Sequence, residues 1–90
     1  MTLADVREQI DRLDDQLVGL LAQRQQQVQR AARFKADEAA VRAPDRRASM
    51  MARLRERALE EDLDPSVVDA VWTAMIDAFI ALELRKHQSL

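Results

Sequence analysis

The sequence predicts an all-helical protein with three helices per chain, the first of them much the longest. Of its 90 residues, 33% are charged and 48% are hydrophobic, and the chain holds one glycine, two prolines and no tyrosine. Strands and their turns use glycine, proline, asparagine and aromatic residues, so this composition favours long helices. Apolar residues also recur at helical spacing in three segments separated by the two prolines. Ninety residues supply one core, which predicts a single domain over residues 1–90.

The first helix is predicted over about residues 3–36. Thr2 is the expected N-cap, and Asp5 follows three residues later, which is a weak form of the capping box. The apolar stripe comprises Leu3, Val6, Ile10, Leu13, Leu17, Leu20, Leu21 and Val28. Such a helix is roughly 50 Å long and exceeds a compact domain of this size. A second copy of the chain would cover the stripe, so the length of the helix predicts a homodimer.

Two prolines set the boundaries of the remaining helices. A break is predicted over residues 37–44, because Pro44 disfavours helix at the preceding residue and suits the first turn of a new helix. The second helix is predicted over residues 44–60. The third is predicted over about 65–87, with Asp64 as its N-cap. The expected inward-facing residues are Met50, Met51, Leu54, Ala58 and Leu59, and then Val68, Val71, Trp72, Met75, Ile76, Phe79 and Ile80.

Composition and charge exclude several classes of function. The absence of cysteine excludes a disulfide scaffold, a thiolate zinc site and a cysteine nucleophile, and it fits a reducing compartment. The formal net charge of −2 supplies no basic field for nucleic acid. No uncharged apolar run approaches the ~20 residues that cross a membrane, and early acidic residues contradict a secretory signal. We therefore expect a cytoplasmic protein that binds neither nucleic acid nor membrane. No metal-ligand spacing or phosphate loop occurs, so no metal or cofactor is expected.

Charged residues interrupt the apolar seam of the first helix. Alternating steps of four and three residues from Leu3 pass through Arg7, Asp14, Arg24 and Lys35. In one interpretation, the long basic side chains bury their stems and keep their charged heads in water. In the other, they surround an anion, because burying an unpaired cation is costly.

Further charges suggest the chemistry of that anion. Glu83 lies on the apolar face of the third helix, although a surface pair with Lys86 or His87 would also explain a charge there. Basic residues cluster where the second helix begins, and there they oppose the helix dipole unless an anion is shared. These residues are Arg42, Arg46 and Arg47. Several guanidinium groups near one buried carboxyl suit a small polycarboxylate ligand.

The chain resembles the all-helical chorismate mutase family in three segments, LADVREQIDRLD (3–14), LLAQR (20–24) and RFK (33–35). The similarity covers nearly the whole chain. Within that family, RFKADEAA (33–40) followed by APDR (43–46) is most similar to the isochorismate pyruvate lyase branch. That branch forms salicylate, shares the mutase fold and retains mutase activity.

The resemblance implies an intertwined homodimer with two equivalent sites and no cofactor. Arg7 would come from the partner's long helix, whereas Arg24, Lys35, Arg46 and Glu83 would come from the other chain. The three arginines would hold the two carboxylates of the substrate, and Lys35 would donate to the enolpyruvyl ether oxygen. Glu83 stands where bacterial mutases carry glutamine, and it would donate to the same oxygen only when protonated. The implied reaction is the [3,3] rearrangement of chorismate to prephenate, a step of aromatic amino-acid biosynthesis.

Two alternatives to the mutase reaction are kept. Many bacterial mutases place an acid near the start of the second helix to accept the ring hydroxyl of chorismate, and the corresponding positions here are Ala43 and Arg47. This departure favours an isochorismate pyruvate lyase, which gives salicylate and pyruvate. We place the mutase first because it is the commoner activity of the family. The other alternative is a non-enzymatic helical dimerisation module, which would tolerate leucine or glutamine at Arg24 and Lys35.

Overall fold

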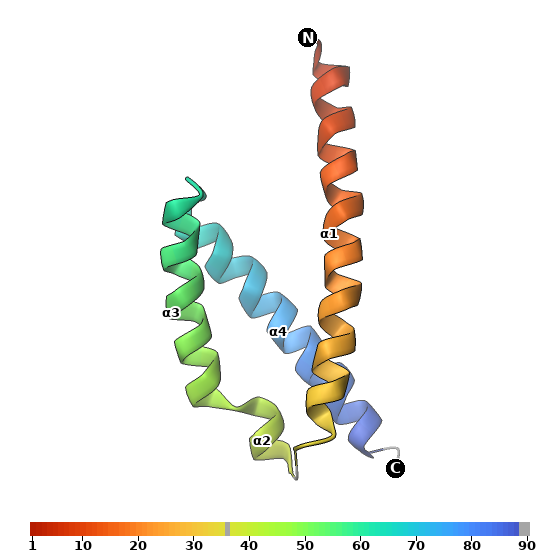
Figure 1. Cartoon of the computed structure of the whole chain (residues 1–90), viewed down its shortest axis with the longest axis vertical. Helices are drawn as coiled ribbons and strands as arrows, with labels where there is room; N and C mark the ends of the chain where they lie inside the picture. The colour runs from red at the N-terminus through yellow and green to blue at the C-terminus, as the bar shows by residue number, and fades with distance from the viewer. Residues whose placement is uncertain (36, 89–90) are drawn as a thin grey trace. The chain divides into compact units, whose positions relative to one another are not determined.

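The computed structural model describes residues 1–35 and 37–88, and its regular elements are all helical. They are α1 (Leu3–Ala32), α2 (Glu38–Arg42), α3 (Pro44–Glu60) and α4 (Pro65–Gln88) (Figure 1). The predicted class and the three long helices, with the first the longest, are confirmed. The chain divides into two compact units, Met1–Ala31 and Ala32–Leu90, and the expected single domain stays a prediction. No helix in the described ranges has both the length and the apolar character needed to cross a membrane.

The first unit consists of α1, and its N-terminus carries the predicted capping box. The Thr2 N–H donates to Asp5 Oδ2 at 2.8 Å, and the Asp5 N–H donates to Thr2 Oγ1 at 3.2 Å. None of the residues of α1 is buried. Its apolar stripe is open to solvent, with Leu13 at 56% and Leu17 at 55% exposure. Apolar surface of this extent is unfavourable in water.

The end of α1 differs from the sequence-based prediction. The helix ends at Ala32, so the prediction that it extends to about residue 36, which lies outside the described ranges, was too long. A turn follows, in which the Lys35 N–H donates to the Ala32 carbonyl at 3.1 Å. Asp37 then has an extended backbone and accepts the Ala40 N–H at 2.9 Å, as the N-cap of α2. An N-cap residue takes non-helical angles, so a continuous helix cannot pass through it.

The predicted break between residues 37 and 44 contains the five-residue helix α2. Ala43 ends α2 and begins α3, with left-handed backbone angles of φ 38° and ψ 63°. Pro44 disfavours the right-handed helical region at Ala43, which explains why one helix does not continue through this residue. A residue with a Cβ costs about 1–2 kcal/mol in the left-handed region. The junction between α2 and α3 is therefore a single strained residue.

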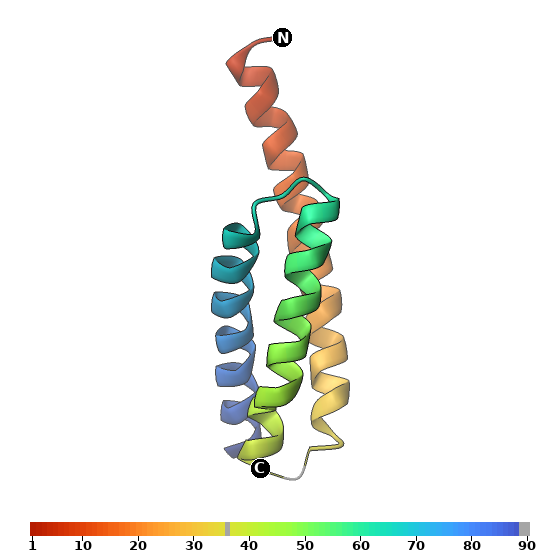
Figure 2. The same cartoon turned by 90° about the vertical axis from the view of Figure 1, so that its left-hand side faces the viewer.

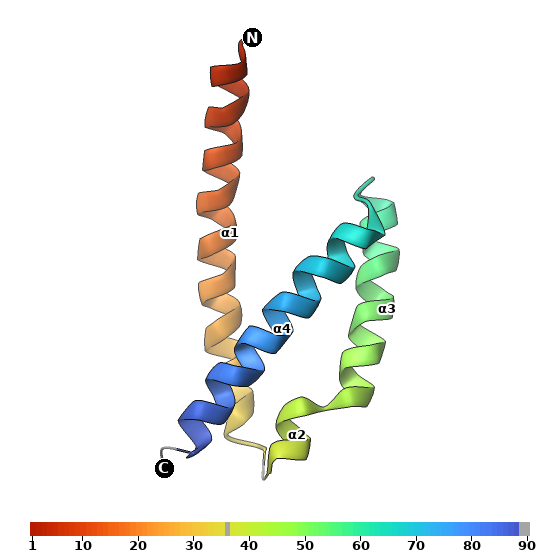
Figure 3. The same cartoon turned by 180° about the vertical axis from the view of Figure 1, so that it is seen from behind.

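The helices α3 and α4 form a hairpin through a tightly bonded turn (Figure 3). The Leu63 N–H donates to the Ala58 carbonyl at 2.8 Å, and the Asp62 N–H donates to the Leu59 carbonyl at 3.3 Å. With Asp62 at φ 57°, these bonds form a Schellman motif that satisfies the last carbonyls of α3. The predicted bounds of α3 are confirmed, and so is Asp64 as the N-cap of α4, since it accepts from Ser66 N–H at 2.9 Å.

The core of the second unit is small and lies where α4 contacts α3 and α2 (Figure 2). Its buried apolar residues are Val41, Met51, Ala58, Val68 and Ile76. The other residues predicted to face inward are half-buried, namely Met50, Leu54, Trp72, Met75, Phe79 and Ile80. The prediction was wrong for Leu59 and Val71, which are 67% and 48% exposed. A two-helix contact covers one stripe of each helix, and apolar residues to the side of that stripe stay in solvent.

The N-cap of α4 generates a prediction about pH. Hydrogen bonds from the backbone N–H and then the hydroxyl of Ser66 hold the pKa of Asp64 below its usual 3.8. The unfolded chain therefore takes up this proton first, so the contribution of Asp64 to stability is present at neutral pH and is lost as the pH falls through the lowered pKa. We expect Asp64→Ala to lower the Tm at pH 7, and we expect its difference from wild type to shrink below pH 3.8.

Asp64→Asn is the matched control, because asparagine is an equally good N-cap and does not titrate. The Tm of Asp64→Asn at pH 7 should stay close to that of wild type. A Tm difference between Asp64→Ala and wild type that stays constant from neutral to strongly acidic pH would contradict the assignment.

Candidate functional site

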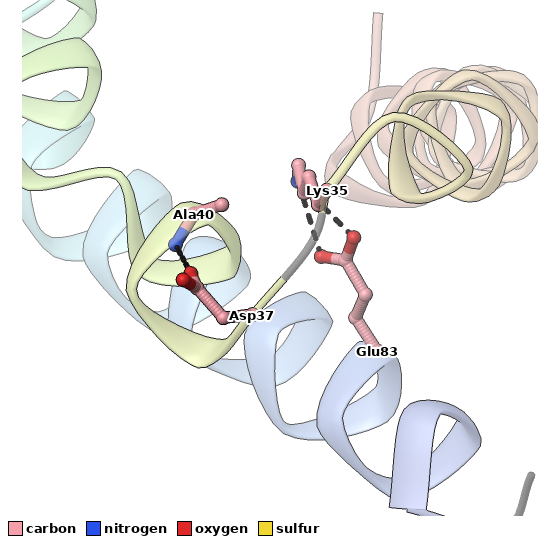
Figure 4. A network of polar contacts seen from close by, with 4 residues as sticks. All are labelled: Lys35, Asp37, Ala40 and Glu83. Carbon is pink, nitrogen blue, oxygen red and sulfur yellow. Dashed lines mark hydrogen bonds and ion pairs between the residues drawn. The ribbon is translucent and has the colours of Figure 1, made fainter.

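Two residues predicted for the site, Lys35 and Glu83, form an ion pair. The Lys35 Nζ lies 3.1 Å from Glu83 Oε1 and 3.3 Å from Oε2, so both carboxylate oxygens accept from it (Figure 4). Glu83 is the buried charged residue of the described chain, at 8% exposure, and the Lys35 side chain is 24% exposed. A buried carboxylate is costly without a partner, and the ammonium group of Lys35 supplies that partner.

Separate elements position the two side chains. Glu83 follows Ile76 by seven residues on α4, which places it on the same, core-facing side of the helix. Lys35 lies in the turn before α2, and Figure 4 shows Glu83 extending from α4 towards it. The backbone around Lys35 is fixed on one side by its bond to Ala32 and on the other by the Asp37 cap. The pair therefore joins a turn and a helix that are 48 residues apart.

The surface interpretation of Glu83 is wrong. That interpretation required an exposed carboxylate paired with Lys86 or His87, whereas Glu83 is buried and bonds to Lys35. The side chain of His87 lies outside the part of the chain that the structure describes. The sequence pattern predicted that Glu83 lies on the apolar face of the third helix, and its burial agrees with that placement.

The three arginines near the start of α3 differ in their partners. Arg42 pairs with Glu38 one turn away on α2, at 2.9 Å, and both side chains are exposed. Arg47 crosses from α3 to α4, where its Nη1 lies 2.8 Å from Asp77 Oδ1. Arg46 is exposed and has no ion pair among the described residues. Of the three, Arg46 is therefore the one whose guanidinium is available for an external anion.

The remaining predicted cations, Arg7 and Arg24, lie on α1 in the first compact unit. Arg7 is exposed and Arg24 is half-buried. Their part in the site stays a prediction that comes from the resemblance, as does the arrival of Arg7 from a second chain.

The sequence analysis missed Asp77 as a partner of this region. Arg47 and Arg55 are eight residues apart on α3, and Asp69 and Asp77 are eight apart on α4. In an antiparallel hairpin these equal steps bring both pairs together, and Arg55 Nε lies 2.6 Å from Asp69 Oδ1. The equal spacing of opposite charges was the available signal, but its use requires knowing that the two helices pack side by side.

The chemistry available to these residues is electrostatic. Lys35 offers an oriented ammonium group, Glu83 a buried carboxyl group and Arg46 an exposed guanidinium. Among the described residues, no group of three His, Cys, Asp or Glu side chains is arranged to hold a metal ion. The arrangement suits the binding of an anion and the stabilisation of negative charge that develops on an oxygen atom.

Comparison with known proteins shows the family to which the chain belongs. Residues 6–84 match the family model described as chorismate mutase type II. An isochorismate pyruvate lyase of Pseudomonas aeruginosa is 41% identical over 83 residues, which cover 92% of this chain and 82% of that protein. The family match includes Lys35 and Glu83 and extends over most of the chain. The protein therefore belongs to the chorismate mutase type II family.

Proposed function

We propose that this chain is an enzyme that catalyses a cofactor-free pericyclic reaction of a chorismate-type dicarboxylate. The observation that carries the proposal is the part-buried pair of Lys35 and Glu83, in a chain that belongs to the chorismate mutase type II family. The pair supplies a positioned cation in a partly desolvated environment, which is where a charged donor stabilises a polarised transition state most strongly.

Lys35 is the proposed catalytic donor. Chorismate and isochorismate each carry two carboxylates and an enolpyruvyl ether, and negative charge grows on the ether oxygen as its bond to the ring breaks. The interaction of an ammonium group with that oxygen is stronger in the transition state than in the ground state, so it raises kcat. Holding the side chain over the ring supplies the rest of the acceleration through proximity. The rearrangement of chorismate requires no acid, base or metal.

Arginines would bind the two carboxylates. A guanidinium binds a carboxylate through two parallel hydrogen bonds, which fixes both position and orientation. Arg46 has no ion pair with the described residues and is proposed for one carboxylate, with Arg7 and Arg24 completing the set. Arg42 and Arg47 already donate to Glu38 and Asp77. The substrate carboxylate would therefore bind Arg46 without first breaking those two ion pairs.

Isochorismate pyruvate lyase is the reaction that we favour within this class. In it the ring passes one hydrogen to the methylene carbon of the side chain, the ether bond breaks, and salicylate and pyruvate leave. The relative from Pseudomonas aeruginosa is named for this reaction. Ala43 has no polar side chain, and the guanidinium of Arg47 can only donate, so neither offers an acceptor for the ring hydroxyl of chorismate. This reverses the order drawn from the sequence alone, and the mutase reaction becomes the second candidate at the same site.

A homodimer is part of the proposal. The apolar stripe of α1 is exposed and contains no buried residue. A second copy of the chain offers an identical stripe, which is the usual way in which such a surface is covered. The resemblance implies that Arg7 then reaches the site of the partner, so that each site is shared between two chains.

The substrate assay tests the function directly. We expect the purified protein to convert isochorismate to salicylate and pyruvate, and to convert chorismate to prephenate with a lower kcat/KM. Neither rate should change with a chelator. Products are identified by chromatography, and a Lys35→Ala sample prepared in parallel excludes a contaminating host enzyme. Turnover of neither substrate would leave the chain as a helical dimerisation module.

Substitution of Lys35 separates catalysis from folding. Lys35→Ala should lower kcat/KM by about a hundredfold to a thousandfold, the usual loss for one donor to a developing oxyanion. It also leaves Glu83 buried without a partner, which costs about 1–3 kcal/mol of stability. We therefore compare the single variant Lys35→Ala with the double variant Lys35→Ala, Glu83→Gln, in which no carboxylate is left unpaired at this position.

The double variant should keep the Tm of Glu83→Gln and still show the loss of kcat/KM. Glu83→Gln alone should raise activity, because the glutamine amide can donate to the ether oxygen, whereas the carboxylate that accepts from Lys35 cannot. If the rate loss of Lys35→Ala disappears in the Glu83→Gln background, the pair is structural and Lys35 is not the donor.

Mixing of two inactive variants tests the shared site. Arg7→Ala and Lys35→Ala chains, unfolded and refolded together, should regain about a quarter of wild-type activity, because half of the dimers are mixed and each has one intact site. Arg46→Ala mixed with Lys35→Ala is the matched control. Those two residues are proposed to come from the same chain, so that mixture should stay inactive. Equal recovery in both mixtures, or in neither, would contradict the sharing of Arg7.

A further inference from the structure

The helix α3 begins without the kind of cap that the other helices have. Each of the others starts with a side-chain oxygen that accepts a backbone N–H of the first turn, namely Thr2 for α1, Asp37 for α2 and Asp64 for α4. Ala43, at the start of α3, makes no side-chain cap hydrogen bond and has a left-handed backbone. The first turn of α3 is therefore less well fixed by local bonds than that of any other described helix.

The first turn of α3 is instead tied to α4 by a side chain. Arg47 Nη1 lies 2.8 Å from Asp77 Oδ1, with the two side chains 32% and 60% exposed. Two adjacent cations, Arg46 and Arg47, stand at the positive end of the α3 dipole, which disfavours them. The carboxylate of Asp77 neutralises one of them and anchors the turn at the same time. Asp77 thus links the first turn of α3 to α4 through a side chain, and its hydrogen-bond partner is the Arg47 guanidinium rather than a backbone N–H.

We propose that Asp77 is a positioning residue for substrate binding, acting through Arg47 on Arg46. Successive residues of a helix point about 100° apart, so fixing the direction of Arg47 towards α4 also fixes the direction in which Arg46 leaves the helix. A carboxylate bound by two parallel hydrogen bonds requires a guanidinium in one orientation. This inference rests on the proposed function, in which Arg46 binds a carboxylate of the substrate.

The chain contains a matched control for this pair. Arg55 and Asp69 join the same two helices at 2.6 Å, with the same chemistry and similar exposure, about two helical turns beyond Arg47 on α3. Loss of either pair removes one ion pair between the two helices. Only the loss of the Arg47–Asp77 pair is expected to release the first turn of α3.

The experiment compares Asp77→Asn with Asp69→Asn in the dimeric enzyme, using isochorismate and chorismate as substrates. We expect similar, small decreases in Tm for both variants. Asp77→Asn should raise KM by about tenfold with kcat nearly unchanged, because binding is lost equally in the ground state and the transition state. Asp69→Asn should leave both constants close to wild type. The double variant Arg47→Asp, Asp77→Arg exchanges the two charges, and its KM should return to near the wild-type value.

Arg46→Ala completes the cycle. It should raise KM, and Asp77→Asn should add little in the Arg46→Ala background, because the two residues act as a unit. If Arg46→Ala raises KM but the Asp77 and Asp69 variants behave alike, the positioning role is wrong and the proposed function stands. An effect of Asp77→Asn that persists in full without Arg46 would also overturn it. An Arg46→Ala enzyme with wild-type KM would remove Arg46 from the proposed site, and this inference with it.

Discussion

The buried carboxylate of Glu83 has to be compensated, and this requirement ties the turn after α1 to the last part of α4. Lys35 provides the compensation through both carboxylate oxygens. Because the ammonium group is held and partly removed from water before substrate arrives, little reorganisation is needed when charge develops beside it. The interaction that stabilises the turn in the free protein therefore also prepares the donor for the proposed reaction. A surface lysine in a mobile side-chain ensemble would offer neither property.

The helix α4 organises the second unit, because three of its acidic residues each hold a different segment. Glu83 holds Lys35, Asp77 holds the first turn of α3 through Arg47, and Asp69 holds a later turn of α3. The apolar core contributed by α2, α3 and α4 is small. Exposed ion pairs add little stability individually. Asp77 and Asp69 nevertheless bond two different turns of α3, so the two pairs are compatible with the same register of the hairpin as the apolar core.

The two ends of the hairpin are built in different ways. At the α3–α4 turn, a Schellman motif and the Asp64 cap satisfy the backbone locally. At the α2–α3 junction, Ala43 takes a strained conformation before Pro44 and supplies no cap. Strained residues are often found where function requires a particular backbone path. Here the strained residue directly precedes the turn that carries Arg46.

Local signals in the sequence determined the helical class, the bounds of α3, the caps at Thr2 and Asp64, and the anomalous charges at Lys35, Glu83 and Arg46. Each of these depends on residues a few positions apart, so it can be inferred without a fold. The end of α1 and the helix α2 follow from the turn at Ala32 and the Asp37 cap, which are local features that the sequence analysis did not use. The exposure of Leu59 and Val71 was decided by which surfaces meet. The pairing of Lys35 with Glu83 and of Arg47 with Asp77 was decided in the same way. Partners 48 and 30 residues apart become neighbours only when α4 folds back beside α2 and α3, because an ion pair forms between groups that packing has already brought together.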